Sequence, residues 1–296
     1  MKFQLSCVQN LRCDGPTKMK YHLQAMSALL HLRTPMDRNN SAAPALAFER
    51  MCVESFIHHS ATILLVDGST DLVCDVQQLV KKFEACFTNR SPSITESWLD
   101  KLQNSLVLGP LPDVFVTLMQ VTNQAPSAGP LDEASVNNIH HQDCQILDWG
   151  QYLQSNSVSK MWEGKLYMHA IRALILRDIH TRHKSTSKFH TFGFRQSIIQ
   201  GLHILKMHTL QAPFEKYYLL PLAVLGSVLT SEEDVAVIRE KFNVITESSN
   251  SSTGRHIREI LEEIWKTQVG STENFVMEGL GEFLHSANIG RSTSDL

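Results

Sequence analysis

The feature that most limits what this chain can fold into is a helical spacing of apolar residues that recurs along its length. Side chains three or four positions apart share one face of a helix. The clearest example spans residues 254–269, where the apolar residues lie on one such face: Ile257, Ile260, Leu261, Ile264 and Trp265. Arg258 and Glu262 fall one turn apart on the other side, where they can form an ion pair. This segment is therefore predicted to be an amphipathic helix.

The same spacing predicts helices in most of the remaining chain. The predicted segments are residues 19–33, 48–66, 131–153, 161–180, 194–210, 217–229 and 231–246. Two more are expected to begin at Ser93 and at Pro112. The alternation typical of strands is almost absent. We expect an all-α fold of about nine to eleven helices, with the segment 217–229, which is apolar nearly all round, at its centre.

One domain is expected. The only turn-rich break, Ala125 to Pro130, is short, and no segment repeats at a fixed period. We therefore predict a single all-helical domain over residues 1–296, with flexible ends at 1–18 and 286–296. Helix bundles enclose cavities where facing side chains fail to meet, so an internal hydrophobic cavity is part of this prediction.

Charge and cysteine spacing exclude several classes of protein. Lys and Arg number 27 against 30 Asp and Glu, which argues against direct binding to a nucleic-acid backbone. The six cysteines contain no Cys-x-x-Cys pair, which excludes zinc ribbons and thioredoxin-type chemistry. No run reaches the roughly 20 apolar residues of a membrane span, and no secretory leader is evident. We expect an intracellular protein of the cytoplasm or nucleus.

Few side chains stand out as candidates for chemistry. His59 lies on the apolar stripe of its helix, and Tyr167 and His169 lie on the helix predicted over 161–180. Each is either a core residue with a hydrogen-bond partner or an acid, base or donor in a pocket. Trp149 and Tyr152 are aromatic side chains that could wall a ligand cavity or simply fill the core.

Metal and cofactor sites are not expected. The adjacent pairs His58–His59 and His140–His141 point about 100° apart on a helix, so they are poorly placed to bind one ion. No glycine-rich phosphate loop or nucleophile elbow occurs. The basic stretch from Arg177 to Lys188 is interpreted as a solvated connector.

Four segments in sequence order resemble parts of one known family. They are Phe48–Phe56, Leu108–Phe115, Trp162–Leu176 and Leu220–Phe242. The family is the fungal-specific transcription factor domain, the regulatory region of many zinc-cluster regulators, and the resemblance runs from about Phe48 to the C-terminus. It implies an all-helical domain, often dimeric, which in some sterol-responsive relatives encloses a hydrophobic ligand.

This chain departs from the family in one respect. The family's regulators carry a six-cysteine zinc cluster near the N-terminus, whereas only Cys7 and Cys13 lie in that region here, with no basic stretch beside them. We therefore expect a regulator-like domain without its own DNA-binding module. Its partners would be a hydrophobic small molecule, contacted by Trp149, Tyr152 and Tyr167, and a second copy of the chain.

Two other functions are compatible with the same sequence features. The alternative is a stand-alone enzyme of secondary metabolism, a cofactor-free cyclase, isomerase or pericyclase that uses the same cavity on a polyketide- or terpene-like substrate. Shape and one or two hydrogen-bond donors can supply such catalysis, with His59, Tyr167 and His169 as the candidate groups. The third possibility is an interaction scaffold with a filled core.

Overall fold

The computed structural model describes residues 16–36, 43–67, 71–83, 133–155, 161–182, 188–210, 218–249, 252–271 and 275–289. Within these ranges the chain forms ten helices and, apart from one isolated bridge between Leu229 and Phe275, no β structure. The helices are α2 (Pro16–Leu32), α3 (Ala43–Asp67), α4 (Asp71–Lys82), α8 (Glu133–Ser155), α9 (Met161–Arg182), α10 (Lys188–Met207), α11 (Leu219–Gly226), α12 (Glu232–Ser249), α13 (Ser252–Gln268) and α14 (Met277–Ile289). The all-α prediction is confirmed.

Eight of these helices correspond to segments that the apolar spacing predicts, with shifted ends. Apolar spacing alone does not identify α4 and α14. The helices expected at Ser93 and Pro112, and the turn at Ala125–Pro130, lie outside the described residues. Helix extends into both expected flexible ends, because α2 begins at Pro16 and α14 ends at Ile289. No described helix has the length and apolarity required to cross a membrane.

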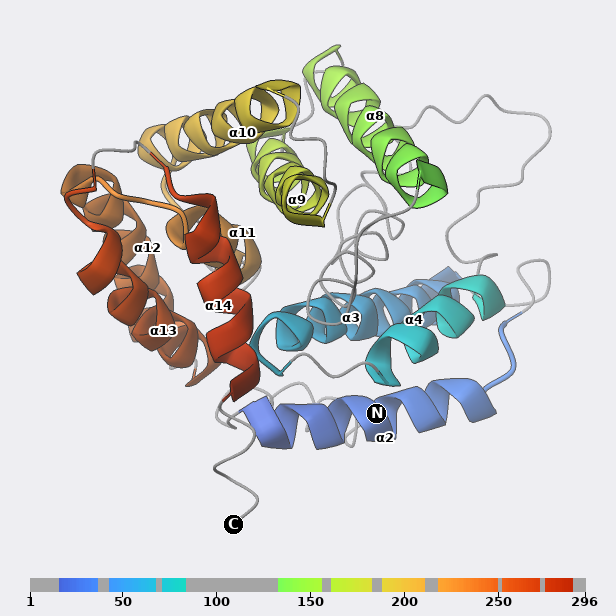
Figure 1. Ribbon diagram of the computed structural model, residues 1–296. Coiled ribbons are helices and arrows are strands. Elements are labelled where there is room, and N and C mark those ends of the chain that lie inside the picture. The colour runs from blue at the N-terminus through green and yellow to red at the C-terminus, as the bar shows by residue number, and fades with distance from the viewer. Residues whose placement is uncertain are drawn as a thin grey trace.

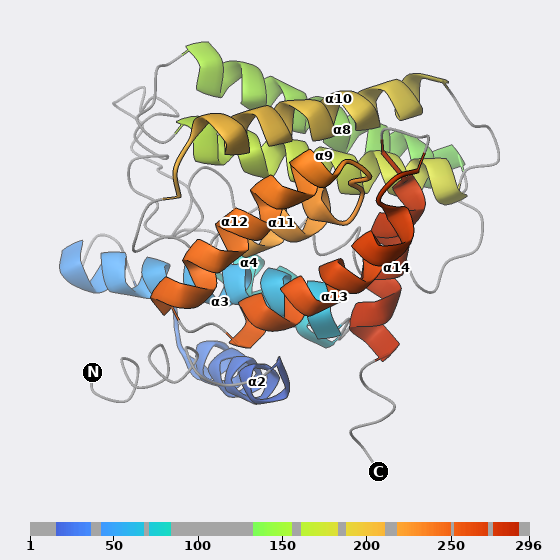
Figure 2. The same ribbon diagram turned by 90° about the vertical axis from the view of Figure 1, so that its left-hand side faces the viewer.

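The helices pack in three groups around α11 (Figures 1 and 2). α9 contacts α8 and α10 on one side and α11 on the other, and α3 packs against α2, α4 and α14. α12, α13 and α14 cover the remaining side of α11 (Figure 1). Helices α3 and α9 therefore belong to different groups, and α11 contacts both of them.

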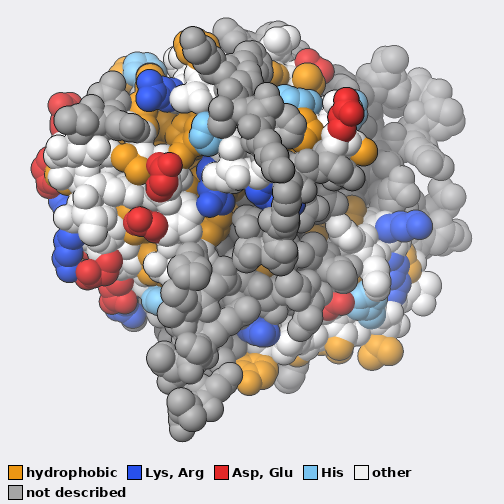
Figure 3. Space-filling view, viewed as in Figure 1, with side chains coloured by type: hydrophobic (Ala, Val, Ile, Leu, Met, Phe, Trp, Pro, Cys, Tyr) orange, Lys and Arg blue, Asp and Glu red, His pale blue; other side chains and the backbone are white. Residues whose placement is uncertain are grey.

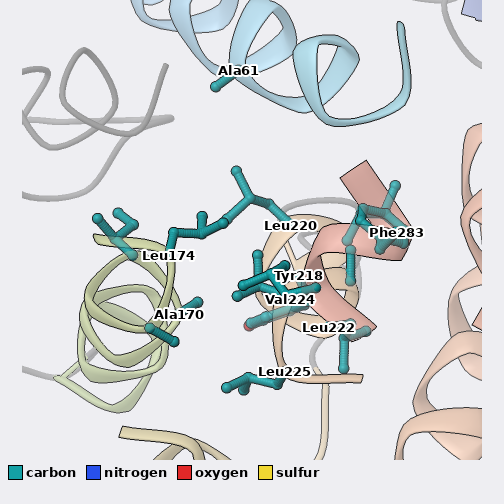
Figure 4. Close-up of a cluster of buried hydrophobic side chains, with 14 of the residues drawn as sticks. Ala61, Ala170, Leu174, Tyr218, Leu220, Leu222, Val224, Leu225 and Phe283 are labelled. Atoms are coloured by element: carbon teal, nitrogen blue, oxygen red, sulfur yellow. The ribbon is translucent and has the colours of Figure 1, made fainter. Parts of the chain in front are cut away.

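The short helix α11 is the centre of the core. All eight of its residues are buried, as expected for a helix that is apolar on every side. Figure 4 shows its side chains facing Ala170 and Leu174 of α9, with Ala61 of α3 above them. The Trp265 Nε1–H of α13 donates a hydrogen bond to the Gly226 carbonyl oxygen (2.8 Å). One connected cluster of buried apolar side chains includes residues of all ten described helices.

The segment after α11 leaves the helix and ties two other helices in place. Ser227 N–H still donates to Ala223 O, but Val228 O then accepts from Val276 N–H (3.0 Å) at the start of α14. Thr230 O accepts from Gly270 N–H (3.1 Å), and Gly270 adopts φ +89°, a conformation that favours glycine after a helix end. Helix α11 is therefore shorter than the predicted segment 217–229.

Helices α12 and α13 are joined across the surface by charged side chains. The predicted pair Arg258–Glu262 is present at 3.5 Å. Arg239 of α12 adds a second, two-pronged contact to the same carboxylate, at 2.8 and 3.0 Å, and its guanidinium lies over the Trp265 ring. These hydrogen bonds and charges lower the pKa of Glu262.

Candidate functional site

Helix α3 carries several polar side chains into the interior of the protein. Glu49, Glu54, His58, Ser60 and Thr62 are all buried. Some of them have partners close by: Arg33 Nε lies 2.8 Å from Glu49 Oε1, Arg50 Nε lies 2.7 Å from Glu54 Oε1, and the Thr62 hydroxyl donates to His58 O. A buried polar group is costly unless it is hydrogen-bonded, so this concentration of polar side chains makes α3 a candidate for a functional role.

The polar contact that joins α3 to α9 is made by His58 and Tyr167. The Tyr167 hydroxyl lies 3.4 Å from His58 Nε2. His58 is almost fully buried, and its pKa lies well below the usual 6.5, chiefly because burial disfavours the charged ring and secondly because His59 is near. The imidazole is therefore neutral at neutral pH. A neutral imidazole has one donor and one acceptor nitrogen, and a phenol hydroxyl can do either.

Apolar side chains continue from this pair along both helices. Ala61 follows His58 by one turn on α3, and Ala170 and Leu174 follow Tyr167 by one and two turns on α9. All three are buried, and Figure 4 shows Ala170 and Leu174 turned toward Leu220 and its neighbours on α11. We call this set, His58, Ala61, Tyr167, Ala170, Leu174 and Leu220, the α3–α9 site. It offers two hydrogen-bonding groups at one end of an apolar surface.

The residues predicted from sequence are only partly brought together. Tyr167 faces His58 rather than His59, which is half-buried and meets the His58 ring edge-on at 5.3 Å. His169 is two positions from Tyr167 and so points to the opposite side of α9. Burial, followed by the charges of Arg172 and Lys165, lowers the pKa of His169 to about 4. Trp149 and Tyr152 lie on α8, but their side chains are outside the described part of the structure.

His58 is the residue that sequence reasoning missed. The sequence predicts that His59 lies on an apolar stripe of its helix, but α3 is enclosed by other helices and has no single apolar face. The available signal was the mixture of apolar and polar residues all round α3, which is typical of a buried helix with internal hydrogen bonds.

Comparison with known families identifies the helical region that includes α9. The family described as "Fungal specific transcription factor domain" matches residues 124–275, just over half of the chain. The chain belongs to this family. It is accordingly a regulator-type helical domain. No curated protein and no solved structure matches the chain.

The fungal transcription factor match divides the α3–α9 site between two parts of the chain. Tyr167, Ala170, Leu174 and Leu220 lie within the matched residues 124–275, whereas α3 precedes them. Of the four resembling segments, Trp162–Leu176 and Leu220–Phe242 lie inside the match and the two earlier ones lie outside it. The family match therefore covers the α9 and α11 residues of the site, whereas its α3 residues, His58 and Ala61, lie outside the match.

Three aromatic rings stack between α9 and the start of α11. Trp162 of α9 stacks on His208 with ring centroids 4.8 Å apart and on Tyr218 at 5.4 Å, and its plane is 2° from that of His208 and 5° from that of Tyr218. Tyr218 is buried next to α11, whereas His208 is exposed. The stack thus joins the N-terminal end of α9 and the residue after α10 to the start of α11.

The basic stretch from Arg177 to Lys188 is not simply a solvated connector. Arg177 and Arg182 lie on α9 and are only partly exposed, and Arg182 bridges the buried Asp178 at 3.1 Å. Burial raises the pKa of Asp178 and lowers that of Arg177. Farther along α9, Arg172 bridges Asp143 of α8 at 2.8 Å. These groups fix neighbouring helices, and among the described residues no group of three His, Cys, Asp or Glu side chains could hold a metal ion.

Proposed function

We propose that this regulator-type domain holds a hydrophobic small molecule between α3, α9 and α11. The observation that carries the proposal is the His58–Tyr167 pair, a neutral donor–acceptor couple placed at the end of a buried apolar surface. Small-molecule sites in proteins are mostly apolar and use a few polar groups to orient the ligand. A guest with one carbonyl or hydroxyl group would have its apolar body against Leu174 and Leu220 and its oxygen at Tyr167.

Two small residues in the walls make the proposal testable. Ala61 and Ala170 are buried on α3 and α9 and expose almost no surface. If a guest occupies the space beside them, a larger side chain at either position fills that space. If the interior is already full, the same side chain overpacks the core and costs about 1–3 kcal/mol of stability.

The test is a titration of the purified chain with Nile red, an apolar dye that carries a carbonyl acceptor. We expect saturable binding, which Ala170→Leu abolishes and which Tyr167→Phe weakens roughly three- to tenfold through loss of one hydrogen bond. Ala236→Leu, at an exposed position of α12, is the matched control and leaves binding unchanged. Absence of saturable binding, or equal binding by Ala170→Leu that is folded by circular dichroism, would reject the proposal.

A cofactor-free cyclase or isomerase remains the second candidate, and the placement of His58 beside the Tyr167 hydroxyl favours it. A neutral imidazole can accept a proton, and the adjacent Tyr167 hydroxyl can donate a hydrogen bond to developing charge on a substrate. The discriminating experiment incubates the protein with linear terpene and polyketide compounds and separates isomers by chromatography. A product that disappears with His58→Gln and Tyr167→Phe supports catalysis. Recovery of bound but unchanged compound supports a binding domain alone.

The charge balance of the chain bears on whether the protein contacts DNA. We place the protein in the cytoplasm or nucleus and propose that it acts without contacting DNA directly, because Lys and Arg do not exceed Asp and Glu. An electrophoretic mobility assay with mixed-sequence DNA is expected to show no shift of the purified chain. A shift at physiological salt would contradict this part of the account.

A further inference from the structure

The outer face of α10 leaves large apolar side chains exposed to solvent. On the inner face, Phe194, Ile198 and Leu202 are buried, where α10 packs along α9. On the outer face, three large apolar residues remain 68%, 47% and 68% exposed: Phe192, Ile199 and Met207. Surface helices ordinarily bury their large apolar residues and turn polar ones outward, so this exposure points to a surface that another molecule covers.

A guanidinium and an imidazole lie between these apolar side chains on the same face. Successive positions are 3, 4, 4 and 4 residues apart, so five exposed side chains follow one line along the helix: Phe192, Arg195, Ile199, His203 and Met207. We call this set the α10 ridge. At about 1.5 Å per residue, it runs for about 22 Å, or about four turns. Figure 3 shows hydrophobic side chains beside Lys, Arg and His side chains at the upper left, where Figure 1 places α10.

The charge of α10 has one sign. Its residues Lys188–Met207 include Lys, Arg and His but no Asp or Glu. Lys206, beside the ridge, is already paired with Asp234 of α12 at 2.7 Å. Arg195, in contrast, forms no ion pair with any carboxylate in the part of the chain that the structure describes. A partner that carries carboxylates next to apolar side chains would complement both the charge and the apolar residues of the ridge.

The composition of the ridge favours a helix over a membrane as its partner. Helices that lie on membranes keep their basic residues on the polar face, so that the apolar face can enter the lipid. In the ridge, Arg195 and His203 lie between the apolar residues, where lipid chains would have to surround them. A second helix instead meets the ridge along a single line, and can place an apolar residue against Phe192 and a carboxylate against Arg195.

We propose that the α10 ridge binds an acidic amphipathic helix of a partner protein. Apolar residues of that helix, spaced by three or four positions, pack against the apolar residues of the ridge, and its carboxylates pair with Arg195. The ridge is preformed, because α10 packs against α9, α11 and α12, and a Cβ at Gly201 would lie 2.8 Å from Leu225 Cδ1 of α11. No ridge residue belongs to the α3–α9 site, so this proposal does not depend on a bound ligand.

Fluorescence anisotropy with a labelled synthetic peptide of about 16 residues tests the proposal. One peptide has Leu at helical spacing on one face and Glu on its flanks, and a second peptide has Lys in place of every Glu. We expect the Glu peptide alone to bind saturably, with a Kd on the order of 10–100 µM for so small an interface. Phe192→Ser weakens this binding about tenfold or more, because an apolar contact is lost. Arg195→Glu weakens it about tenfold and makes the chain prefer the Lys peptide.

Tyr21→Ser is the matched control, because Tyr21 is 66% exposed on α2, and it leaves binding of the Glu peptide unchanged. Circular dichroism verifies that each variant is folded. Absence of saturable binding up to about 500 µM, equal binding of the two peptides, or binding that Phe192→Ser leaves unchanged would each overturn the proposal. Loss of binding in Tyr21→Ser would place the surface on α2 instead.

Cosedimentation with phosphatidylserine vesicles distinguishes the peptide partner from a membrane. We expect no cosedimentation of the chain. Vesicle binding that Phe192→Ser abolishes, together with no binding of the Glu peptide, would overturn the proposal and assign the α10 ridge to a lipid surface.

Discussion

Gly279 and Gly281 lie two positions apart on α14 and therefore face opposite sides of the helix, where the space beside them differs sharply. A Cβ at Gly279 would overlap the Ser227 carbonyl oxygen and the Gln268 amide, whereas one at Gly281 would meet only the flexible end of Arg177, 2.6 Å from Nη2. Alanine ordinarily stabilises a helix interior relative to glycine by about 1 kcal/mol. We predict that Gly279→Ala instead lowers the free energy of unfolding by about 2–3 kcal/mol.

Gly281→Ala is the matched control, and we expect its stability within about 1 kcal/mol of the original chain because a guanidinium can move aside. Urea denaturation followed by circular dichroism measures both variants. Equal effects of the two substitutions would show that the close approach of Gly279 to Ser227 is not a constraint on α14.

His169 makes the stability of the protein depend on pH. Its pKa of about 4 in the folded chain lies below the ordinary 6.5, so the unfolded chain takes up the proton first as pH falls. Above pH 6.5 the ring is neutral in both the folded and the unfolded chain, and the free energy of unfolding has its full value. As the pH falls from 6.5 toward 4, protonation of His169 in the unfolded chain lowers the free energy of unfolding. Between pH 6.5 and 5 we expect a loss of about 2 kcal/mol from this residue.

Denaturation midpoints across this pH window, in the original chain and in His169→Gln, measure the effect. We expect a smaller loss of unfolding free energy between pH 6.5 and 5 in His169→Gln. Part of the loss remains, because the pKa of His58 is also lowered. His203→Gln, at an exposed position of α10, serves as the control and keeps the original pH dependence. An unchanged pH profile in His169→Gln would contradict this account of the buried ring.

At the scale of residues, the sequence identified one half of the site. Tyr167 was a candidate because it lies on a mostly buried helix, and it does meet a histidine of α3. The sequence pattern does not show whether His58 or His59 contacts Tyr167. On a helix enclosed by other helices, both positions have apolar side chains around them. Which one faces α9 depends on how α3 packs against four other helices, and this information is not local.

At the scale of elements, we expect a buried hydrogen bond to contribute more to the attachment of α13 than an exposed ion pair does. Trp265 is buried and joins α13 to α11 through Gly226 O, whereas Glu262 joins α13 to α12 with both partners about one-third exposed. We predict that Trp265→Phe costs about 2–4 kcal/mol, from the lost volume and the lost hydrogen bond to Gly226 O. Glu262→Gln should cost less than about 1 kcal/mol, because solvent screens the pair.

Thermal or urea unfolding of these two variants tests the comparison, and added salt provides a further measurement. The cost of Glu262→Gln should diminish at high salt, whereas that of Trp265→Phe should not. If the surface pair proved the more costly to remove, the attachment of α13 would rest on α12 rather than on the core helix α11.

Apolar spacing fails to identify α4 and α14 for two different reasons. In α4, Leu72, Val76 and Leu79 have helical spacing, but the helix is only 12 residues long and the pattern is too short to identify it. In α14 the pattern is weakened by Gly279 and Gly281, which are poor helix formers. Their presence follows from packing: Gly279 lies against the Ser227 carbonyl and Gly281 against Arg177. Only the folded structure shows why a helix would tolerate both.

At the scale of the whole molecule, we propose that the helices form one domain. The connected core includes side chains from all ten described helices, and α11 contacts members of each group. We therefore predict a single cooperative transition in urea, with tryptophan fluorescence and far-ultraviolet circular dichroism giving the same midpoint. Two separated transitions would show that α2–α4 fold independently of the family domain.

The proposed ligand site rests on the claim that α3, α9 and α11 leave room for an apolar guest. Nuclear magnetic resonance of dissolved xenon tests this claim most directly, because xenon enters empty apolar cavities without needing a specific partner. We predict a saturable xenon shift in the original chain and in Ala236→Leu, and its loss in Ala170→Leu. A shift that never saturates, or one that Ala170→Leu leaves unchanged, would contradict the account.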